Sequence, residues 1–320
     1  MIDSLFLLFQ VLAVLIIMIP LNGILMNLWL RLAQTLNLSR KVIIVLTIGL
    51  LLSIPELFIA LTALQLNVPE LALGNALGTG IILISLVAGI IAIYNKQLKT
   101  NEIFSSDNLN LLSFTALLNV VLAFDGRLSR LDGVVLIFGY FIYLIILSSL
   151  KGNFSILKKT KLNKGKALLT FLLLIAGFAG IWGLSYLLNL RAIQIQEYTS
   201  FSLFAIGAVL VAPLGAIPEL IFEMELSNKQ ESKLNLSELF TSLITNTTLI
   251  LGIMILINPI SIVAMNGATF YYYTTLVLAL VLLLFNYYSR TKNNLNWKEG
   301  TILVISYIIY LVSSLILVLS

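Results

Sequence analysis

Long apolar runs follow one another along this chain, with short polar stretches between them. About 20 consecutive apolar residues suffice to cross a bilayer as a helix. Runs of this kind lie near residues 4–30, 42–65, 69–94, 108–125, 131–150, 167–189, 198–226, 235–258, 269–288 and 300–319. The pattern predicts an all-α polytopic membrane protein with ten transmembrane helices.

The positions of the basic residues predict how these helices are oriented. Cytoplasmic loops of membrane proteins are enriched in Lys and Arg. If the N-terminus is placed outside, 16 of the 19 basic residues fall in inside loops, and only Arg127, Arg130 and Arg191 fall in outside loops. Both termini are then extracytoplasmic, and the basic linker 151–166 is cytoplasmic.

The chain divides into two halves that resemble each other. Five runs lie in residues 1–150 and five in residues 167–320, so the two halves would insert with opposite orientation. The motif Ile-Pro-Glu-Leu occupies residues 54–57 and returns 163 residues later at residues 217–220. We therefore predict two inverted five-helix repeats joined by the linker 151–166.

A second pair of tracts supports the duplication. Residues 133–144 read GVVLIFGYFIYL, and residues 300–311 read GTILVISYIIYL. Both tracts begin with Gly, share Tyr at their eighth and eleventh positions, and follow an acidic residue, Asp132 or Glu299. Unrelated apolar helices would not be expected to share all of these features.

The composition limits the chemistry that the chain can perform. It is 60% hydrophobic and 10% charged, with a mean hydropathy of +1.06. There is no Cys and no His, which excludes disulfides, thiol chemistry and zinc or copper sites of the usual type. A bound metal would be held by oxygen, which suits Ca²⁺, Mg²⁺, Na⁺ or K⁺. The net charge of +5 lies in short loops, so we expect the lipid bilayer as a partner, no nucleic acid and no cofactor.

Glu56 and Glu219 are the strongest candidates for a functional site. A carboxylate within hydrocarbon is costly and marks function by default. Each follows a proline, Pro55 or Pro218, which should break the second and seventh helices and free backbone carbonyls near the middle of the membrane. Carboxylates beside freed carbonyls suit a hard cation. The alternative is that the prolines only kink the helices and the glutamates pair with buried donors.

Neutral oxygen ligands are expected on the helices that follow. Asn75 and Thr79 are four residues apart and share a face of the third helix. Glu238, Ser242 and Asn246 form the same kind of stripe on the eighth. These side chains could instead form hydrogen bonds between helices. The predicted metal ligands are Glu56, Glu219 and Asn246, and the further candidate cation ligands are Ser53, Asn75, Thr79, Glu238 and Ser242.

These motifs resemble those of the cation/Ca²⁺ exchanger superfamily, in particular the bacterial and archaeal sodium/calcium exchanger membrane proteins. That family reads G-T-S-x-P-E, with an Asn nineteen residues after the Glu in G-N-x-x-G-S-N-x-x-N. Here Asn75 and Glu238 stand nineteen residues after Glu56 and Glu219. The family's Ser falls on Thr79 and Ser242. The resemblance implies the ten-helix fold with an external N-terminus, and Ca²⁺ and Na⁺ or H⁺ as transported substrates.

The chain departs from the family pattern at several positions. Residues 51–53 are Leu-Leu-Ser and residues 214–216 are Leu-Gly-Ala where the family has Gly-Thr-Ser, so one hydroxyl remains of four. The last Asn or Asp of the motif falls on Leu83 and Asn246, and Glu238 adds a carboxylate. The implied ligand set is therefore weighted towards the second half, and the coupling ion stays open between Na⁺ and H⁺.

Charge arithmetic predicts exchange rather than one-way release. Two carboxylates neutralise one Ca²⁺, and two buried charges left without it would be unfavourable, so monovalent cations or protons must replace it. We predict a secondary antiporter that exchanges Ca²⁺ for Na⁺ by alternating access, with H⁺ coupling or a transport-inactive ion-binding scaffold as alternatives. Enzyme motifs are absent, and the expected location is the plasma membrane. Glu223 could serve an ion path or could snorkel, with Glu225, to the interface.

Overall fold

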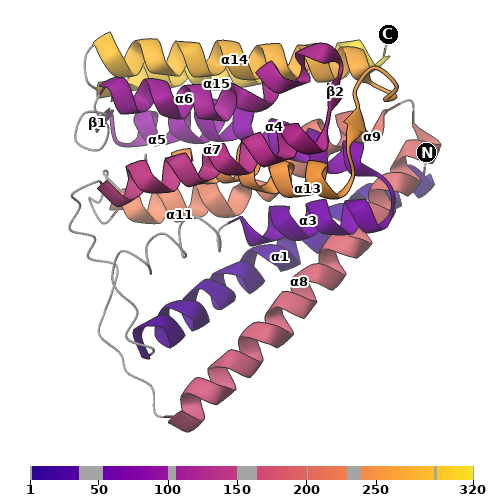
Figure 1. Cartoon of the computed structure of the whole chain (residues 1–320), viewed down its shortest axis with the longest axis vertical. Coiled ribbons are helices and arrows are strands. Elements are labelled where there is room, and N and C mark those ends of the chain that lie inside the picture. The colour runs from indigo at the N-terminus through magenta and orange to yellow at the C-terminus, as the bar shows by residue number, and fades with distance from the viewer. Residues whose placement is uncertain are drawn as a thin grey trace.

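A computed structural model of the chain describes residues 2–35, 53–99, 106–149, 164–199, 201–228, 239–291 and 294–319. Most helices lie roughly parallel in one stack, and two long helices run obliquely along one side of it (Figure 1). These two are α1 (Ile2–Thr35) and α8 (Lys164–Tyr198). The first residues of α1 and the last residues of α15 (Trp297–Leu319) lie at the same end of the stack (Figure 1).

The remaining elements form two series, in which α5 and α13, each preceded by a π-helix and followed by a strand, occupy corresponding places. The first half contains α3 (Ile54–Gln65), α4 (Pro69–Ile82), the π-helix η2 (Leu83–Val87), α5 (Ala88–Tyr94), β1 (Gln97–Lys99), α6 (Ser106–Leu122), the 3₁₀-helix η3 (Ala123–Asp125), β2 (Arg127–Leu128) and α7 (Arg130–Ser149). The second half contains α9 (Leu203–Ala205), the π-helix η4 (Ile206–Val211), α10 (Ala212–Gly215), α11 (Ile217–Asn228), the π-helix η5 (Thr245–Ile250), α13 (Leu251–Ile257), β3 (Ile260–Ser261), α14 (Ala268–Thr291) and β4 (Asn294–Asn296).

Seven helices in the described residues are long and apolar enough to cross a membrane. They are Phe6–Ala33, Pro69–Tyr94, Gly165–Tyr198, Leu203–Ile221, Leu239–Ile257, Ala268–Ser289 and Trp297–Val318. Each overlaps one of the ten predicted runs. Two shorter apolar helices, Ile54–Gln65 and Ser113–Asp125, overlap the second and fourth runs, and α7 overlaps the fifth.

One predicted boundary is wrong. The sixth run was expected to end near residue 189, but α8 continues to Tyr198. Arg191 lies within this last part of the helix, where its Nη1 donates a 2.7 Å hydrogen bond to Oε1 of Gln194. This contact between side chains three residues apart favours helix beyond the apolar run.

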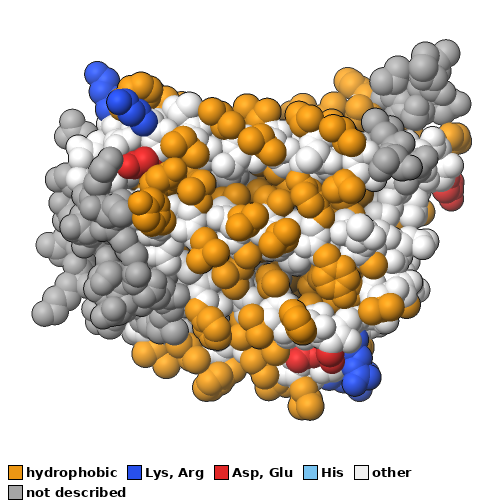
Figure 2. Space-filling view, turned by 90° about the horizontal axis from the view of Figure 1, so that it is seen from above, with side chains coloured by type: hydrophobic (Ala, Val, Ile, Leu, Met, Phe, Trp, Pro, Cys, Tyr) orange, Lys and Arg blue, Asp and Glu red, His pale blue; other side chains and the backbone are white. Residues whose placement is uncertain are grey.

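The surface of the molecule is that of an integral membrane protein. Hydrophobic side chains cover much of the face shown in Figure 2, and the charged side chains visible there lie at its edges. Aqueous solvent would disfavour so large an exposed apolar surface, whereas lipid accommodates it.

Burial separates the central helices from the peripheral ones. The apolar windows of Pro69–Tyr94 and Leu239–Ile257 are 83% and 78% buried, whereas those of Phe6–Ala33 and Gly165–Tyr198 are 33% and 17% buried. The helices that carry the predicted oxygen ligands therefore form the centre, and α1 and α8 form a pair at the periphery. Asn189 ties α8 to α3, because its Nδ2 donates to the carbonyl of Ile59 and to Oγ1 of Thr62.

Two of the close helix crossings between the halves form a reciprocal pair. A Cβ at Gly89 of α5 would lie 2.7 Å from the carbonyl oxygen of Gly300 in α15. A Cβ at Gly133 of α7 would likewise lie 2.9 Å from the carbonyl oxygen of Gly252 in α13. Only glycine permits backbones to approach this closely, as is common between membrane helices.

The repeated acidic residues before two of these glycines are helix caps. Oδ2 of Asp132 accepts a 2.7 Å hydrogen bond from the backbone N–H of Ser129. Oε2 of Glu299 accepts a 2.8 Å hydrogen bond from the N–H of Asn296, whose Oδ1 in turn accepts from the N–H of Glu299. These are capping boxes at the starts of α7 and α15. The two acids thus stabilise helix ends.

In the ranges that the structure describes, the fold is all-α apart from four strands of two or three residues. β1 pairs with β4 and β2 pairs with β3, both antiparallel. The β1–β4 pair joins the end of α5 to the start of α15. The β2–β3 pair joins the start of α7 to the end of α13. The strands were not expected from the sequence, because segments this short lack a readable alternation of apolar and polar residues.

Candidate cation-binding site

The first Ile-Pro-Glu-Leu motif forms the start of α3. Ser53 is the N-cap, and Pro55 and Glu56 lie in the first turn. The N–H of Leu57 donates a 3.0 Å hydrogen bond to the carbonyl of Ser53. Proline is well accepted here, because the first-turn positions of a helix have no N–H partner within it. The chain before Ser53 lies outside the described residues, so the predicted break at Pro55 is seen from its C-terminal side.

The second motif also forms a helix start, and here both sides are described. α10 ends at Gly215, Ala216 forms a turn, and α11 begins at Ile217. The N–H of Leu220 donates to the carbonyl of Ala216 at 3.1 Å, which repeats the Leu57–Ser53 bond. The helix is therefore interrupted beside Pro218, where the sequence predicts a break.

The two helix starts bring Glu56 and Glu219 together. Each glutamate is 4% exposed, and the two side chains are close enough to interact electrostatically. Both line a cavity of about 20 Å³. Such a volume is close to that of one water molecule or one ion. The cavity is lined by Leu15, Met18, Ile19 and Asn22 of α1, Pro55, Glu56 and Ile59 of α3, Asn75 of α4, Leu214 and Gly215 of α10, and Glu219 of α11.

Four other predicted ligands are buried but do not line this cavity. They are Ser53, Thr79, Ser242 and Asn246, none more than 1% exposed. Within the described part of the chain, their side-chain oxygens form no hydrogen bond, and neither does the amide nitrogen of Asn246. Unsatisfied buried polar groups are uncommon in proteins and call for an explanation, such as a bound ion or water.

Neighbouring hydroxyls on the same helices behave differently. Thr247 and Thr248 donate to carbonyls four residues earlier, at 2.8 and 2.5 Å, and Ser85 does the same at 2.5 Å. Buried hydroxyls in these helices can therefore be satisfied by their own backbone. The oxygens of Thr79 and Ser242 are not satisfied in this way and remain available to a ligand. A buried hydroxyl without a hydrogen bond also occurs away from the predicted site, because Ser185 Oγ forms none within the described residues.

The sequence also indicates two further acidic candidates, Glu238 and Glu223. Glu238 lies outside the described residues, so its predicted role as a ligand has no structural counterpart. Glu223 is 0% exposed, and the interpretation that its side chain snorkels to the interface is therefore wrong. It lies on α11, which contacts α5 and η2.

Sequence reasoning missed Asn22. It is 7% exposed on α1 and lines the same cavity as the two glutamates. The repeated motifs gave no indication of it, because none of them includes α1. The available signal was an amide near the middle of a largely apolar run, which also contains Gln10 and Asn27.

The polar side chains that line the cavity are carboxylates and amides, which offer oxygen ligands, and Met18 also lines it. Two carboxylates and two side-chain amides suit a hard cation such as Ca²⁺, which takes six to eight oxygen ligands in proteins. Among the described residues, no three acidic side chains gather into a metal cluster. The site therefore depends on one carboxylate pair supplemented by neutral oxygens. Pro218 has no N–H to donate to the carbonyl of Leu214, which lies beside the cavity.

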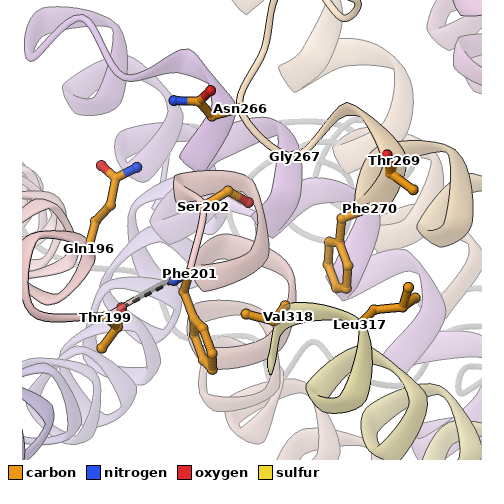
Figure 3. A pocket seen from close by; sticks show the side chains of 10 residues that line it. All are labelled: Gln196, Thr199, Phe201, Ser202, Asn266, Gly267, Thr269, Phe270, Leu317 and Val318. Atoms are coloured by element: carbon orange, nitrogen blue, oxygen red, sulfur yellow. Dashed lines mark hydrogen bonds between the residues drawn. The ribbon is translucent and has the colours of Figure 1, made fainter. Parts of the chain in front are cut away.

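A larger pocket of about 490 Å³ lies at one end of the helix stack. It is formed by the end of α8, the start of α9, the start of α14 and the end of α15 (Figure 3). Its polar side chains include Gln196, Ser202 and Asn266. No charged residue of the described chain lines it, so it lacks the carboxylates that a divalent cation site requires.

Comparison with known proteins places this geometry in context. The family model described as sodium/calcium exchanger protein matches residues 6–149 and 169–316. A putative antiporter, CaxA of Alkalimonas amylolytica, is 27% identical over 286 residues, which cover 87% of this chain and 89% of that protein.

Two solved structures share the fold. The H⁺/Ca²⁺ exchanger CAX superposes with a TM-score of 0.69 at 14% identity, over 97% of this chain and 86% of that chain. The sodium-calcium exchanger NCX_Mj superposes with a TM-score of 0.64 at 22% identity, over 95% of this chain and 97% of that chain. At these identities the likeness establishes the fold alone.

Proposed function

The chain belongs to the sodium/calcium exchanger protein family, and on this premise we propose that it exchanges Ca²⁺ at the centre formed by Glu56 and Glu219. Membership makes it a cation/Ca²⁺ antiporter of the membrane rather than an enzyme. The observation that carries the proposed site is the convergence of two buried carboxylates, from two helix starts, on one cavity of about 20 Å³.

The cavity explains why transport at such a site takes the form of exchange. Glu56 and Glu219 together neutralise the charge of one Ca²⁺. When Ca²⁺ leaves, two adjacent carboxylates would remain in a place where each is 4% exposed, which is unfavourable. Monovalent cations or protons must therefore take its place before the site can turn to the other side of the membrane. Ca²⁺ and the coupling ion are the transported substrates, and the bilayer is the surrounding partner.

We place this centre between two inverted five-helix repeats, residues 1–150 and 167–320, linked by residues 151–166. The order of elements supports this arrangement. α5 and α13 each span seven residues and begin 163 residues apart, and the π-helices η2 and η5 immediately precede them. The contacts between the halves are reciprocal. β1 of the first half pairs with β4 of the second, and β2 pairs with β3. The Gly89–Gly300 crossing likewise joins α5 to α15, and the Gly133–Gly252 crossing joins α7 to α13.

The orientation proposed from the basic residues has both termini outside the cytoplasm. The two ends of the chain lie at the same end of the helix stack (Figure 1), as ten membrane crossings require. The basic linker 151–166 would then be cytoplasmic, and the plasma membrane is the proposed location.

Sodium is the proposed coupling ion, and the proton is the second candidate. One specific observation favours the proton. Ala216, at the helix break beside Glu219, has no hydroxyl where the family motif has Ser, and none of the described residues that line the cavity carries a hydroxyl. Sodium coordination needs several neutral oxygens, whereas protons need only the carboxylates. Against this, Ser53, Thr79 and Ser242 keep buried hydroxyls that form no hydrogen bond within the described residues.

Vesicle transport separates these candidates. The purified protein is reconstituted into liposomes loaded with Na⁺ at equal pH on both sides, and Ca²⁺ uptake is measured. Uptake that requires internal Na⁺ and persists with a protonophore supports sodium coupling. In a second set of Na⁺-free liposomes with an acidic interior, uptake that collapses with a protonophore establishes proton coupling instead. An absence of uptake under either gradient would indicate an ion-binding scaffold without turnover.

A further inference from the structure

α1 presents one polar side chain to the cavity between the glutamates. The four residues of α1 that line it are Leu15, Met18, Ile19 and Asn22. Their spacing of three, four and seven residues places them on one face of the helix. Three of them are apolar, so Asn22 is the only group on this face that can hydrogen-bond or coordinate. Burying an amide at such a position is unfavourable unless it has a polar partner.

The corresponding face of α8 is built differently. Residues 163 positions later than those of the α1 face include Phe178, Trp182 and Ser185. Phe178 and Trp182 pack edge-to-face on Phe58 of α3, with ring centroids 6.4 and 5.6 Å apart. The α8 face therefore packs its rings on α3, whereas the α1 face lines the cavity.

We propose that the side-chain oxygen of Asn22 is a further ligand of the transported cation, delivered by α1 to the Glu56–Glu219 centre. The proposal rests on the proposed function of that centre. A cavity of about 20 Å³ has room for one ion or one water molecule, so its lining groups would contact the ion directly. Two carboxylates supply at most four oxygens, and Ca²⁺ takes six to eight. Neutral oxygens must supply the remainder, and Asn22 and Asn75 are the two amides that line the cavity.

Ligation by Asn22 would also couple the packing of α1 to the binding of the cation. α1 packs chiefly on α8, and it touches α3 and α10 at the edge of the site. A direct bond from Asn22 to the ion would join this peripheral helix to the central ones while the ion is bound. Asn22 would then contribute to cation affinity without contributing charge.

Three full-length variants test the proposal, each reconstituted for Ca²⁺ exchange and titrated with Ca²⁺ by calorimetry in detergent. Asn22→Leu keeps the size and removes the oxygen, and we expect the apparent KM and Kd for Ca²⁺ to rise about tenfold. Asn22→Asp keeps an oxygen in place and adds charge, so Ca²⁺ binding should be at least as tight as in the wild type. Asn27→Leu is the matched control, because Asn27 is an exposed residue of α1 whose Nδ2 donates to the carbonyl of Gly23, away from the cavity. Its KM should not change.

The outcomes separate the proposal from its premise. If Asn22→Leu binds Ca²⁺ like the wild type while Glu56→Gln is inactive, Asn22 is no ligand although the centre is correct. If Asn22→Asp binds Ca²⁺ more weakly than Asn22→Leu, the amide donates a hydrogen bond to a glutamate instead, and the proposal is overturned. Should Asn22→Leu fail to fold, the Asn22→Asp titration alone decides. Wild-type exchange in Glu56→Gln and Glu219→Gln would refute the centre itself.

Discussion

Replacing either central carboxylate by its amide is the most direct test of the site. Glu56→Gln and Glu219→Gln keep the shape of the side chain and remove one negative charge from a position that is 4% exposed. Two unit charges 4 Å apart attract by about 4 kcal/mol at an effective dielectric constant of about 20, so a divalent ion and one carboxylate attract by about 8 kcal/mol. Dehydration of the ion and the carboxylate offsets a large part of this attraction.

The loss of Ca²⁺ affinity expected after dehydration is taken into account is still large. If half of the attraction persists as net binding, each substitution weakens Ca²⁺ binding by about 4 kcal/mol, or about three orders of magnitude. We therefore expect Ca²⁺ exchange in proteoliposomes to fall below detection in both variants. Calorimetric titration should show the loss of binding directly, and size-exclusion chromatography should show an unchanged, folded protein.

Glu70→Gln provides a matched control. Glu70 also follows a proline, Pro69, in the first turn of a helix, α4, but it does not line the cavity. Its exchange rate should match the wild type. Wild-type exchange by the Glu56 and Glu219 variants would refute the central site, and an equal loss in Glu70→Gln would show that the effect is not specific to it.

The remaining predictions concern a neutral ligand and a helix crossing. Asn75 lines the cavity and Asn246 does not, so Asn75→Ala should raise the apparent KM for Ca²⁺ about tenfold and Asn246→Ala should raise it less. The reverse order in a flux titration would shift the centre of coordination towards η5. Gly89→Ala would place a Cβ 2.7 Å from the carbonyl oxygen of Gly300 and should destabilise the protein by about 1–3 kcal/mol, measured as a lower Tm in detergent. Gly183→Ala, where a Cβ meets nothing within 4 Å, should leave the Tm unchanged, and equal shifts would show that the close crossing is not the cause.

Much of the fold could be predicted from the chain because membrane-spanning segments are local properties. The length of an apolar run decides whether a helix can cross the bilayer, independently of its neighbours. The Pro-Glu motifs likewise predict helix starts locally, because proline removes a backbone donor wherever it stands. The position of Glu56 and Glu219 within such runs was enough to identify them as candidates.

The roles of other repeated residues depended on short-range geometry that the pattern did not reveal. Asp132 and Glu299 looked like further signs of duplication and are capping residues of α7 and α15. Glu223 was compatible with two environments, an ion path or the membrane interface, and the fold buries it fully on α11. Helical periodicity indicates which residues share a face, but it does not tell which neighbour covers that face.

The sequence by itself therefore determined the helical membrane architecture, the duplicated motif and the two central carboxylates. Only the tertiary structure decided which side chains meet those carboxylates. Asn22 precedes Glu56 by 34 residues and Glu219 by 197, and no local pattern relates them. They share a cavity because α1 lies against α8 and reaches α3 and α10, which brings one face of α1 to the two glutamates. Packing between distant helices depends on the summed shapes of many side chains, which are not readable from any one segment.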